Sequence, residues 1–149
     1  MSDGGSRSGW PDRLRPGAVR FTWTSAAYDD TIAFYRDVVG LPIVDEFHAS
    51  FGEDGVIFGL PDTANHLEIV RAQGAARPAD PLDLLVFYLD DADAVVAATA
   101  AFRSRGLTPE AEPHPYWAAN GGVVYRDPDG RGVVYAPWVF GREPGPAEH

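Results

Sequence analysis

The stretch FTWTSAAYDDTIAFYRDVVGL at residues 21–41 predicts a strand, then a helix that begins near two aspartates and ends at a glycine. Residues 84–107, LLVFYLDDADAVVAATAAFRSRGL, repeat this order with their own aspartate pair and their own Gly-Leu ending. Each half closes on a further apolar strand, at residues 66–70 and 133–137. The repeat indicates a doubled module, and two copies of one curved sheet would enclose a cleft suited to a ligand.

The repeat predicts an α+β fold in which two modules form a curved mixed sheet around a cleft. The stretches at both ends are rich in Gly, Arg and Pro and bury little, so we expect disordered tails there. The expected boundaries are a tail at 1–17, one domain at 18–140 (module one 18–72, linker 73–81, module two 82–140) and a tail at 141–149.

Composition narrows the classes of function. The chain has 149 residues, 45% of them hydrophobic, which is enough for one domain with a sizeable core. Its formal net charge of −10 argues against a nucleic-acid partner, because phosphates need a basic surface, and suits a cationic or neutral small ligand. No apolar run is long enough to span a membrane, no signal segment is apparent, and there is no cysteine. We therefore expect a cytoplasmic protein without a membrane partner.

The helix of module one is expected to start at Asp29 or Asp30, whose carboxylate would cap free backbone N–H groups. It is expected to end at Gly40, because glycine adopts the left-handed conformation at a helix end without steric cost. The second helix is expected over residues 91–105.

Three further segments of module two carry local signals. Residues 108–112 predict a strand, and the tetrapeptide DPDG at residues 127–130 predicts the turn of a hairpin. Between them, residues 114–122, HPYWAANGG, predict a loop that is long for a compact domain, and such loops often carry function.

Three motifs together resemble a known family. Residues 32–37, IAFYRD, are followed by Gly40 and Leu41, residues 66–68 read HLE, and DPDG at 127–130 precedes an apolar strand. This combination resembles the vicinal oxygen chelate superfamily, which includes glyoxalase I, extradiol dioxygenases and the bleomycin-resistance proteins. The resemblance spans about residues 19–138 and implies a glyoxalase/bleomycin-resistance-like fold of paired βαβββ modules, often as a homodimer.

Enzymes of that superfamily hold a divalent metal ion with His or Glu side chains on four strands, two from each module. The resemblance places those four positions on Arg20, Glu68, Leu84 and Val134 of this sequence. Only Glu68 offers a metal ligand, because arginine keeps its proton and leucine and valine have no donor atoms. A tight site needs three or four protein ligands, so we expect no metal and no other cofactor.

Arg20 and Glu68 are instead expected to face the cleft as an ion pair, unless Arg20 lies on the surface at the start of its strand. Phe47 and Phe51 would form a second wall. Trp117 would either stack on a ligand or plug the end of the sheet. Strand alternation completes the predicted ligand-binding set: Arg20, Thr22, His66, Glu68, Leu84, Val86, Tyr88, Tyr116, Trp117, Val134 and Trp138. The opposite faces, expected to pack under the helices, carry Phe21, Trp23, Leu67, Ile69, Leu85, Phe87, Val133 and Tyr135.

Two classes of function stay open on the sequence. The first is a metal-free protein that binds and sequesters a small natural product or antibiotic, aromatic or cationic, as the bleomycin-resistance resemblance implies. The second is an enzyme of the isomerase, lyase or dioxygenase type, in which His66 and Glu68 act as acid and base, with or without a metal. A purely structural dimer without a ligand is a third possibility.

Overall fold

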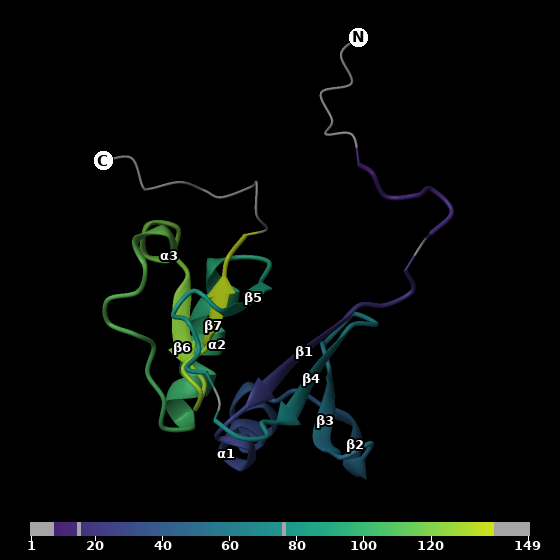
Figure 1. Cartoon of the computed structure of the whole chain (residues 1–149). Coiled ribbons are helices and arrows are strands. Elements are labelled where there is room, and N and C mark those ends of the chain that lie inside the picture. Colours follow the sequence, from purple (N-terminus) through teal and green to yellow (C-terminus); the bar gives the residue numbers. More distant parts are fainter. Residues whose placement is uncertain (1–7, 15, 76, 139–149) are drawn as a thin grey trace, which may run out of the picture.

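Each module folds into its own sheet, and the two sheets lie side by side (Figure 1). The computed structural model describes residues 8–14, 16–75 and 77–138. Module one contains β1 (Arg20–Ser25), α1 (Tyr28–Ala33), the π-helix η1 (Phe34–Val39), β2 (Ile43–Ser50), β3 (Glu53–Gly59) and β4 (His66–Arg71). Module two contains β5 (Leu84–Tyr88), α2 (Ala92–Ser104), α3 (Pro115–Ala119), β6 (Val123–Arg126) and β7 (Gly132–Ala136). The tail predicted at 141–149 lies outside the described residues, as do residues 1–7 of the other tail.

The strand order is β1-β4-β3-β2 in the first sheet and β5-β7-β6 in the second. β1 pairs in parallel with β4, β5 pairs in parallel with β7, and the other neighbours are antiparallel. β1 and β5 are therefore edge strands, and each is the edge nearest to the other module (Figure 1). The predicted α+β class is confirmed, with two sheets of four and three strands in place of one continuous sheet.

Module two lacks the strand that the sequence predicts at residues 108–112. Pro109 has no backbone N–H to donate to a neighbouring strand, and Pro113 follows four residues later. Glu110 N–H still donates to the Val124 carbonyl at 2.9 Å, so the segment lies beside β6 without forming a regular ladder. The described part of this module is βαββ, not βαβββ.

The first helix ends where the sequence predicts. Its second half widens into the π-helix η1, and the N–H groups of Gly40 and Leu41 both donate to the Tyr35 carbonyl, at 3.0 and 2.9 Å. Gly40 has a φ of 86°, the left-handed conformation expected of a glycine that closes a helix.

The start of the same helix differs from the prediction. Asp29 and Asp30 lie inside the first turn, and the N-cap residue Ala27 has no side-chain oxygen to accept a hydrogen bond. Asp29 instead forms an ion pair with Arg71, at 3.2 Å. The N–H groups of Ala26 and Ala27, just before α1, bond to a carboxylate of module two, which a local reading of module one does not reveal.

The other two helices are capped from within their own segments. Asp91 Oδ1 accepts from Ala94 N–H at 2.8 Å at the start of α2, which agrees closely with the helix predicted at 91–105. His114 Nδ1 accepts from Tyr116 N–H at 3.1 Å and caps α3, a short helix where the sequence predicted only a loop. None of the helices in the described ranges is long and apolar enough to cross a membrane.

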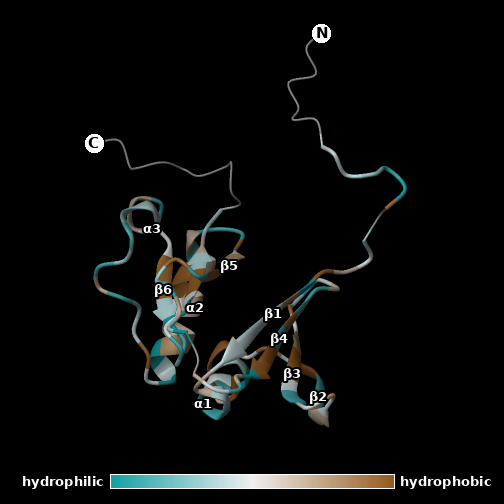
Figure 2. Cartoon of the chain, viewed as in Figure 1, coloured by the Kyte–Doolittle hydropathy of each residue, from teal (hydrophilic) through white to brown (hydrophobic). Residues whose placement is uncertain are grey.

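The main hydrophobic core belongs to both modules. The helix-facing side chains Phe58 and Ile69 of the first sheet lie in one buried cluster with Phe102 and Tyr135 of module two. Hydrophobic stretches accordingly appear on strands of both sheets (Figure 2). Phe21, which alternation predicts on the buried face, is 61% exposed, because it lies near the exposed start of an edge strand. Each module completes its core only when the other is docked against it.

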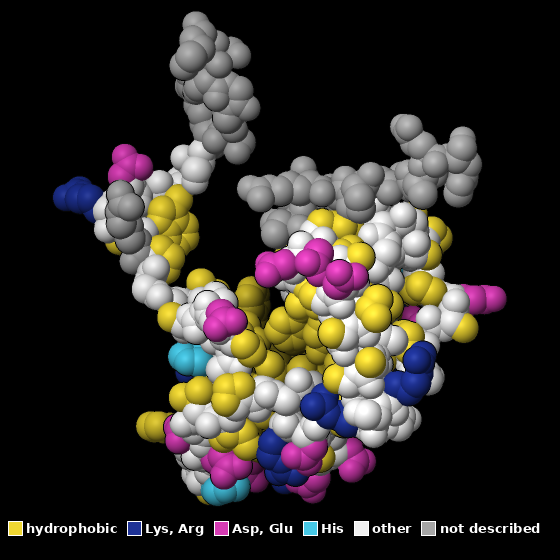
Figure 3. All heavy atoms as spheres, turned by 180° about the vertical axis from the view of Figure 1, so that it is seen from behind, with side chains coloured by type: hydrophobic (Ala, Val, Ile, Leu, Met, Phe, Trp, Pro, Cys, Tyr) yellow, Lys and Arg dark blue, Asp and Glu magenta, His cyan; other side chains and the backbone are white. Residues whose placement is uncertain are grey.

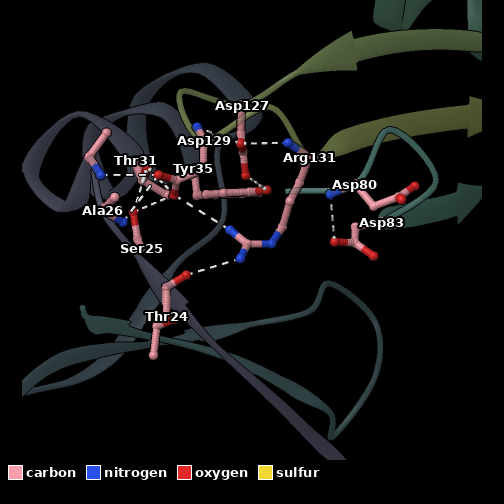
Figure 4. Close-up of polar contacts among 11 residues, drawn as sticks. Thr24, Ser25, Ala26, Thr31, Tyr35, Asp80, Asp83, Asp127, Asp129 and Arg131 are labelled. Atoms are coloured by element: carbon pink, nitrogen blue, oxygen red, sulfur yellow. Dashed lines mark hydrogen bonds and ion pairs between the residues drawn. The ribbon is translucent and has the colours of Figure 1, made fainter. Parts of the chain in front are cut away.

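A polar network joins the modules at the hairpin between β6 and β7 (Figure 4). The Asp129 carboxylate accepts hydrogen bonds from the hydroxyls of Ser25 and Thr31 and from the backbone N–H groups of Ala26 and Ala27. The aspartate of one module thereby fixes the segment that leads into the other module's helix.

Asp127 and Arg131, in the same hairpin as Asp129, also contact module one. Asp127 accepts a hydrogen bond from the Tyr35 hydroxyl at 2.8 Å. Burial, and to a smaller extent the nearby Asp127 charge, raises the pKa of Tyr35, so its hydroxyl stays protonated and donates the bond. Arg131 Nη2 donates to the Thr24 carbonyl at 3.0 Å, and its guanidinium carbon lies 5.0 Å from the centre of the Trp23 ring. We call Asp127, Asp129 and Arg131 with these partners the inter-module network.

Replacing Asp129 with alanine is expected to lower the free energy of unfolding by about 2–3 kcal/mol, because buried N–H and O–H donors lose their acceptor. Burial alone would raise the pKa of Asp129, but the bonds from Ser25, Ala27 and Thr31 outweigh it and lower the pKa. Because the pKa of Asp129 is lower in the folded than in the unfolded protein, Asp129 stabilises the fold at pH values above its unfolded pKa of about 4. This stabilisation is lost as the pH falls through the pKa of the folded protein. Urea unfolding of both proteins should therefore give a constant difference from neutral pH down to about pH 5, shrinking below about pH 4.

The matched control is Asp90→Ala, which removes an exposed carboxylate just before α2. It should leave the free energy of unfolding within about 0.5 kcal/mol of the parent. An equal loss in both variants would mean that Asp129 acts through net charge and not through its bonds.

Candidate functional site

Glu68 lies on the sheet face of module one that the helices leave open. Leu67 and Ile69 on either side of it point into the core, so alternation turns Glu68 to the opposite face. The Thr22 hydroxyl of β1 donates to Glu68 Oε1 at 2.8 Å, and the two residues are paired in register. The Glu68 side chain is only 13% exposed. A mostly buried carboxylate is thus held by its neighbour strand at a defined position.

Arg20 approaches the same carboxylate but is held loosely. Its Nε atom is 3.9 Å from Glu68 Oε1, and the Arg20 side chain is 52% exposed. An ion pair this long and this exposed contributes little to stability. The pair predicted from the sequence is present, and Thr22 makes the closer contact with Glu68.

A row of paired residues runs from Glu68 across the sheet. Glu68 is paired with Ile57 on β3, and Ile57 is paired with Asp45 on β2. A cavity of about 390 Å³ lies on this side of β2, β3 and β4. It is lined by Asp45, Phe47, Ser50, Phe51, Glu53, Ile57, Glu68 and Val70. We call it the Glu68 pocket, and its lining combines three carboxylates with two phenyl rings.

The Phe47 ring lies across Gly55. The two residues are paired in register, and a Cβ atom on Gly55 would collide with the end of the Phe47 ring. Glycine at this position therefore leaves room for the end of the Phe47 ring, which lines the Glu68 pocket. At the tip of the β2–β3 turn, Phe51 is fully exposed. Both rings predicted as a second wall line this pocket.

The predicted residues of module two gather in a different place. Leu84, Val86 and Val134 pack with Trp117 and with the other aromatic side chains of α3 and the end of β7 in one apolar cluster. The Trp117 and Trp138 rings are stacked 5.8 Å apart, and Trp138 Nε1 donates to the Asn120 carbonyl at 2.7 Å. Both indoles are more than 90% buried, so α3 fills this half of the predicted cleft. Tyr116 and Tyr88 lie against Trp138.

The predicted site is therefore divided into two groups. Thr22, Glu68 and, loosely, Arg20 meet on module one, while the residues from Leu84 to Trp138 form the apolar cluster under α3. His66 lies on the same face of β4 as Glu68, and its imidazole has no hydrogen bond within the described residues. The sequence analysis missed Asp45 and Glu53. Alternation places Asp45 on the same face as Phe47, and it places Glu53, the first residue of β3, on the same face as Ile57.

The comparisons with known proteins agree with this fold. The sequence model of the Glyoxalase/Bleomycin resistance protein/Dioxygenase superfamily matches residues 19–135, and the chain belongs to this superfamily. YycE of Bacillus subtilis (strain 168), an uncharacterized protein, is 36% identical over 119 residues, covering 78% of this chain and 85% of YycE. The crystal structure of a B. subtilis YycE protein aligns with a TM-score of 0.70 and 34% identity, over 83% of this chain and 90% of that one.

Two more distant structures share the fold alone. The fosfomycin resistance protein FosX of Listeria monocytogenes, solved with Mn(II) and a dihydroxypropylphosphonic acid, aligns with a TM-score of 0.63 and 10% identity, over 83% of this chain and 93% of FosX. TnmS3, an antibiotic binding protein from a Streptomyces species, aligns with a TM-score of 0.58 and 18% identity, over 78% of this chain and 91% of TnmS3.

The four positions that the resemblance assigns to metal ligands do not fit a divalent ion here. Leu84 and Val134 lie in the apolar cluster and offer no donor atom, and Arg20 donates only protons. Within the residues described, no group of three or more His, Cys, Asp or Glu side chains is arranged to hold a metal. Glu68 alone does not supply the three or four ligands of a tight site.

Gly55→Ala is expected to displace the Phe47 ring and to destabilise the protein by about 1–3 kcal/mol, because the new methyl group occupies the place of the ring. The ring should show altered side-chain NMR signals. Phe47→Leu should lower the free energy of unfolding less in the Gly55→Ala variant than in the parent protein. A double-mutant cycle of urea unfolding measures this difference.

Gly17→Ala serves as the control, because nothing lies within 4 Å of a Cβ atom there. Additive effects of the Gly55 and Phe47 substitutions would show that the ring does not rest on Gly55.

Proposed function

We propose that this protein binds a small organic cation with an aromatic or apolar part in the Glu68 pocket, and sequesters it without converting it. The observation that carries the proposal is the lining, in which Asp45, Glu53 and Glu68 surround the rings of Phe47 and Phe51. The volume of about 390 Å³ is in the range of small-molecule sites.

The charges of the pocket favour a cation over a neutral ligand. Among the described residues no Lys or Arg lines it, and the Arg20 side chain, 3.9 Å from Glu68, is 52% exposed. Carboxylates attract an ammonium or guanidinium group, and a phenyl face adds a cation–π attraction of about 0.5–1 kcal/mol at an exposed site. The net charge of −10 would also raise the association rate of a cation at low salt.

The neighbours in the superfamily support a natural product or antibiotic as the ligand class. One similar fold belongs to a fosfomycin resistance protein and another to an antibiotic binding protein. Sequestration needs only stoichiometric affinity, and a pocket that lacks a metal-binding donor set is compatible with it. The alternative, acid–base catalysis by His66 and Glu68, predicts turnover of the bound compound, which the experiment below detects.

The proposal includes a homodimer that acts in the cytoplasm. Phe21 is 61% exposed on the edge strand β1, where an apolar side chain is unfavourable in water. A second copy that pairs along β1 would cover it.

Binding is tested with phenyltrimethylammonium and its neutral isostere tert-butylbenzene in thermal-shift titrations. The cation should raise the melting temperature, and the isostere should not. At a hundred times its dissociation constant, the cation should add about 2.7 kcal/mol to the free energy of unfolding. Glu68→Gln and Glu53→Gln should each weaken binding about fivefold. Glu112→Gln, which removes an exposed charge outside the pocket, is the matched control.

The same variants are then tested with a panel of cationic antibiotics, followed by mass spectrometry of the recovered compounds. Unchanged compound at one equivalent per chain supports sequestration. The proposed binding site would be contradicted if the neutral isostere bound as well as the cation, or if Glu112→Gln weakened binding as much as the pocket variants do. Conversion of a bound compound would favour the enzyme.

The dimer is tested by light scattering coupled to size exclusion. The protein should elute with the mass of two chains, and Phe21→Glu should shift it to one. Val96→Glu is the control, because Val96 is similarly exposed, at 67%, but lies on α2. A monomeric parent protein, or an equal shift in both variants, would contradict an interface along β1.

A further inference from the structure

A second hollow lies between the two modules. Seen from behind, the molecule has a depression walled mainly by hydrophobic side chains (Figure 3). An open cavity of about 360 Å³ lies where the end of η1 and the β3–β4 turn of module one approach β5 and β7 of module two. We call it the inter-module crevice, and it is lined by Val39, Leu41, Pro61, Asp62, Phe87, Tyr88, Leu89 and Tyr135.

The crevice is separate from the Glu68 pocket. The two cavities share no lining residue. Phe87 and Tyr135 belong to the helix-facing side of the second sheet and pack with the main core, whereas Glu68 lies on the open face of the first sheet. A ligand in the crevice would contact both modules, and a ligand in the Glu68 pocket would contact module one alone.

Aromatic surface dominates the wall from module two. The Phe87 and Tyr135 rings are stacked with centroids 5.4 Å apart and planes inclined by 19°. Tyr88 at the mouth is 40% exposed, which leaves ring surface available to a ligand. Burial raises the pKa of the Tyr135 hydroxyl, so this wall is neutral. Because Tyr135 is buried in the core and Phe87 is partly buried against it, the exposed Tyr88 ring is the surface on which a planar apolar group would stack.

One lining residue carries a charge. Asp62 lies in the β3–β4 turn, and within the described residues its carboxylate has no hydrogen bond or ion pair. No Lys or Arg lines the crevice. A single free carboxylate beside aromatic rings is the complement of an amine on a flat ring system.

We propose that the inter-module crevice is a second binding site, which takes a flat, mostly apolar molecule with one ammonium group. The volume is at the small end of the range for small-molecule sites, which fits one fused ring pair and its amine. The ligand chemistry differs from that of the Glu68 pocket, where three carboxylates surround the cavity. Because both modules form the walls, the occupied crevice also strengthens their docking.

The experiment is a calorimetric titration of the full chain with 1-naphthylmethylammonium and with the neutral 1-naphthylmethanol. Two molecules of the ammonium compound should bind per chain, one in each site. Asp62→Asn and Tyr88→Ala should each weaken one of the two binding events about threefold and leave the other unchanged. Asparagine is the appropriate replacement, because Asp62 has a φ of 58° and asparagine tolerates this conformation.

Two matched variants assign the binding events. Glu68→Gln should weaken only the event that Asp62→Asn and Tyr88→Ala leave unchanged. Asp90→Asn, which removes an exposed carboxylate one residue beyond Leu89 but outside the lining, should change neither. Amide NMR shifts should locate the Asp62-sensitive molecule beside Val39 and Leu89.

The two proposals fail separately. One molecule per chain that depends on Asp62 and Tyr88 alone would support the crevice and contradict the Glu68 pocket. Three outcomes would overturn the crevice as a ligand site. The first is one bound molecule per chain that depends on Glu68 alone, and the second is equal affinity for the neutral alcohol. The third is a Tyr88→Ala variant that changes only the oligomeric state.

Discussion

The Asp129 carboxylate holds the two modules together through four hydrogen bonds from module one. Two of these bonds come from the backbone N–H groups of Ala26 and Ala27, the residues just before the first helix, and the other two come from hydroxyl groups. Asp127 of the same hairpin adds a bond from the Tyr35 hydroxyl inside the shared core. Because buried donors without partners are costly, this hairpin couples the docking of module two to the conformation of the chain where the first helix begins.

The same network reaches the open face of module one through β1. Arg131 donates to the Thr24 carbonyl, and two residues earlier on the same strand the Thr22 hydroxyl holds Glu68. The position of Glu68 relative to the neighbouring strands therefore depends on an edge strand that module two anchors at one end. Docking also leaves the crevice between the modules, because the sheets meet at the hairpin end and are not continuous with each other.

The four positions that the superfamily resemblance assigns to metal ligands carry other side chains in this chain. Leu84 and Val134 lie in an apolar cluster with Trp117 of α3, and Arg20 forms a long, half-exposed ion pair with Glu68. On the open face of module one, Glu68 lines its pocket together with Asp45 and Glu53 and with two phenyl rings. The proposed binding of an organic cation rests on this combination of carboxylates and rings.

The sequence alone determined the module repeat, the helix end at Gly40, a second helix that begins at the second aspartate pair, and the turn at 127–130, because each follows from local propensity. The expected pair of Arg20 and Glu68 came from the resemblance to the superfamily. The sequence also contained the reason for the missing strand, since Pro109 has no N–H to donate. Only the tertiary structure decided that Asp129 accepts hydrogen bonds from the residues just before the first helix, and that Trp117 of α3 packs with Leu84 and Val134. These contacts join residues far apart in the chain, so their geometry is set by how distant segments dock.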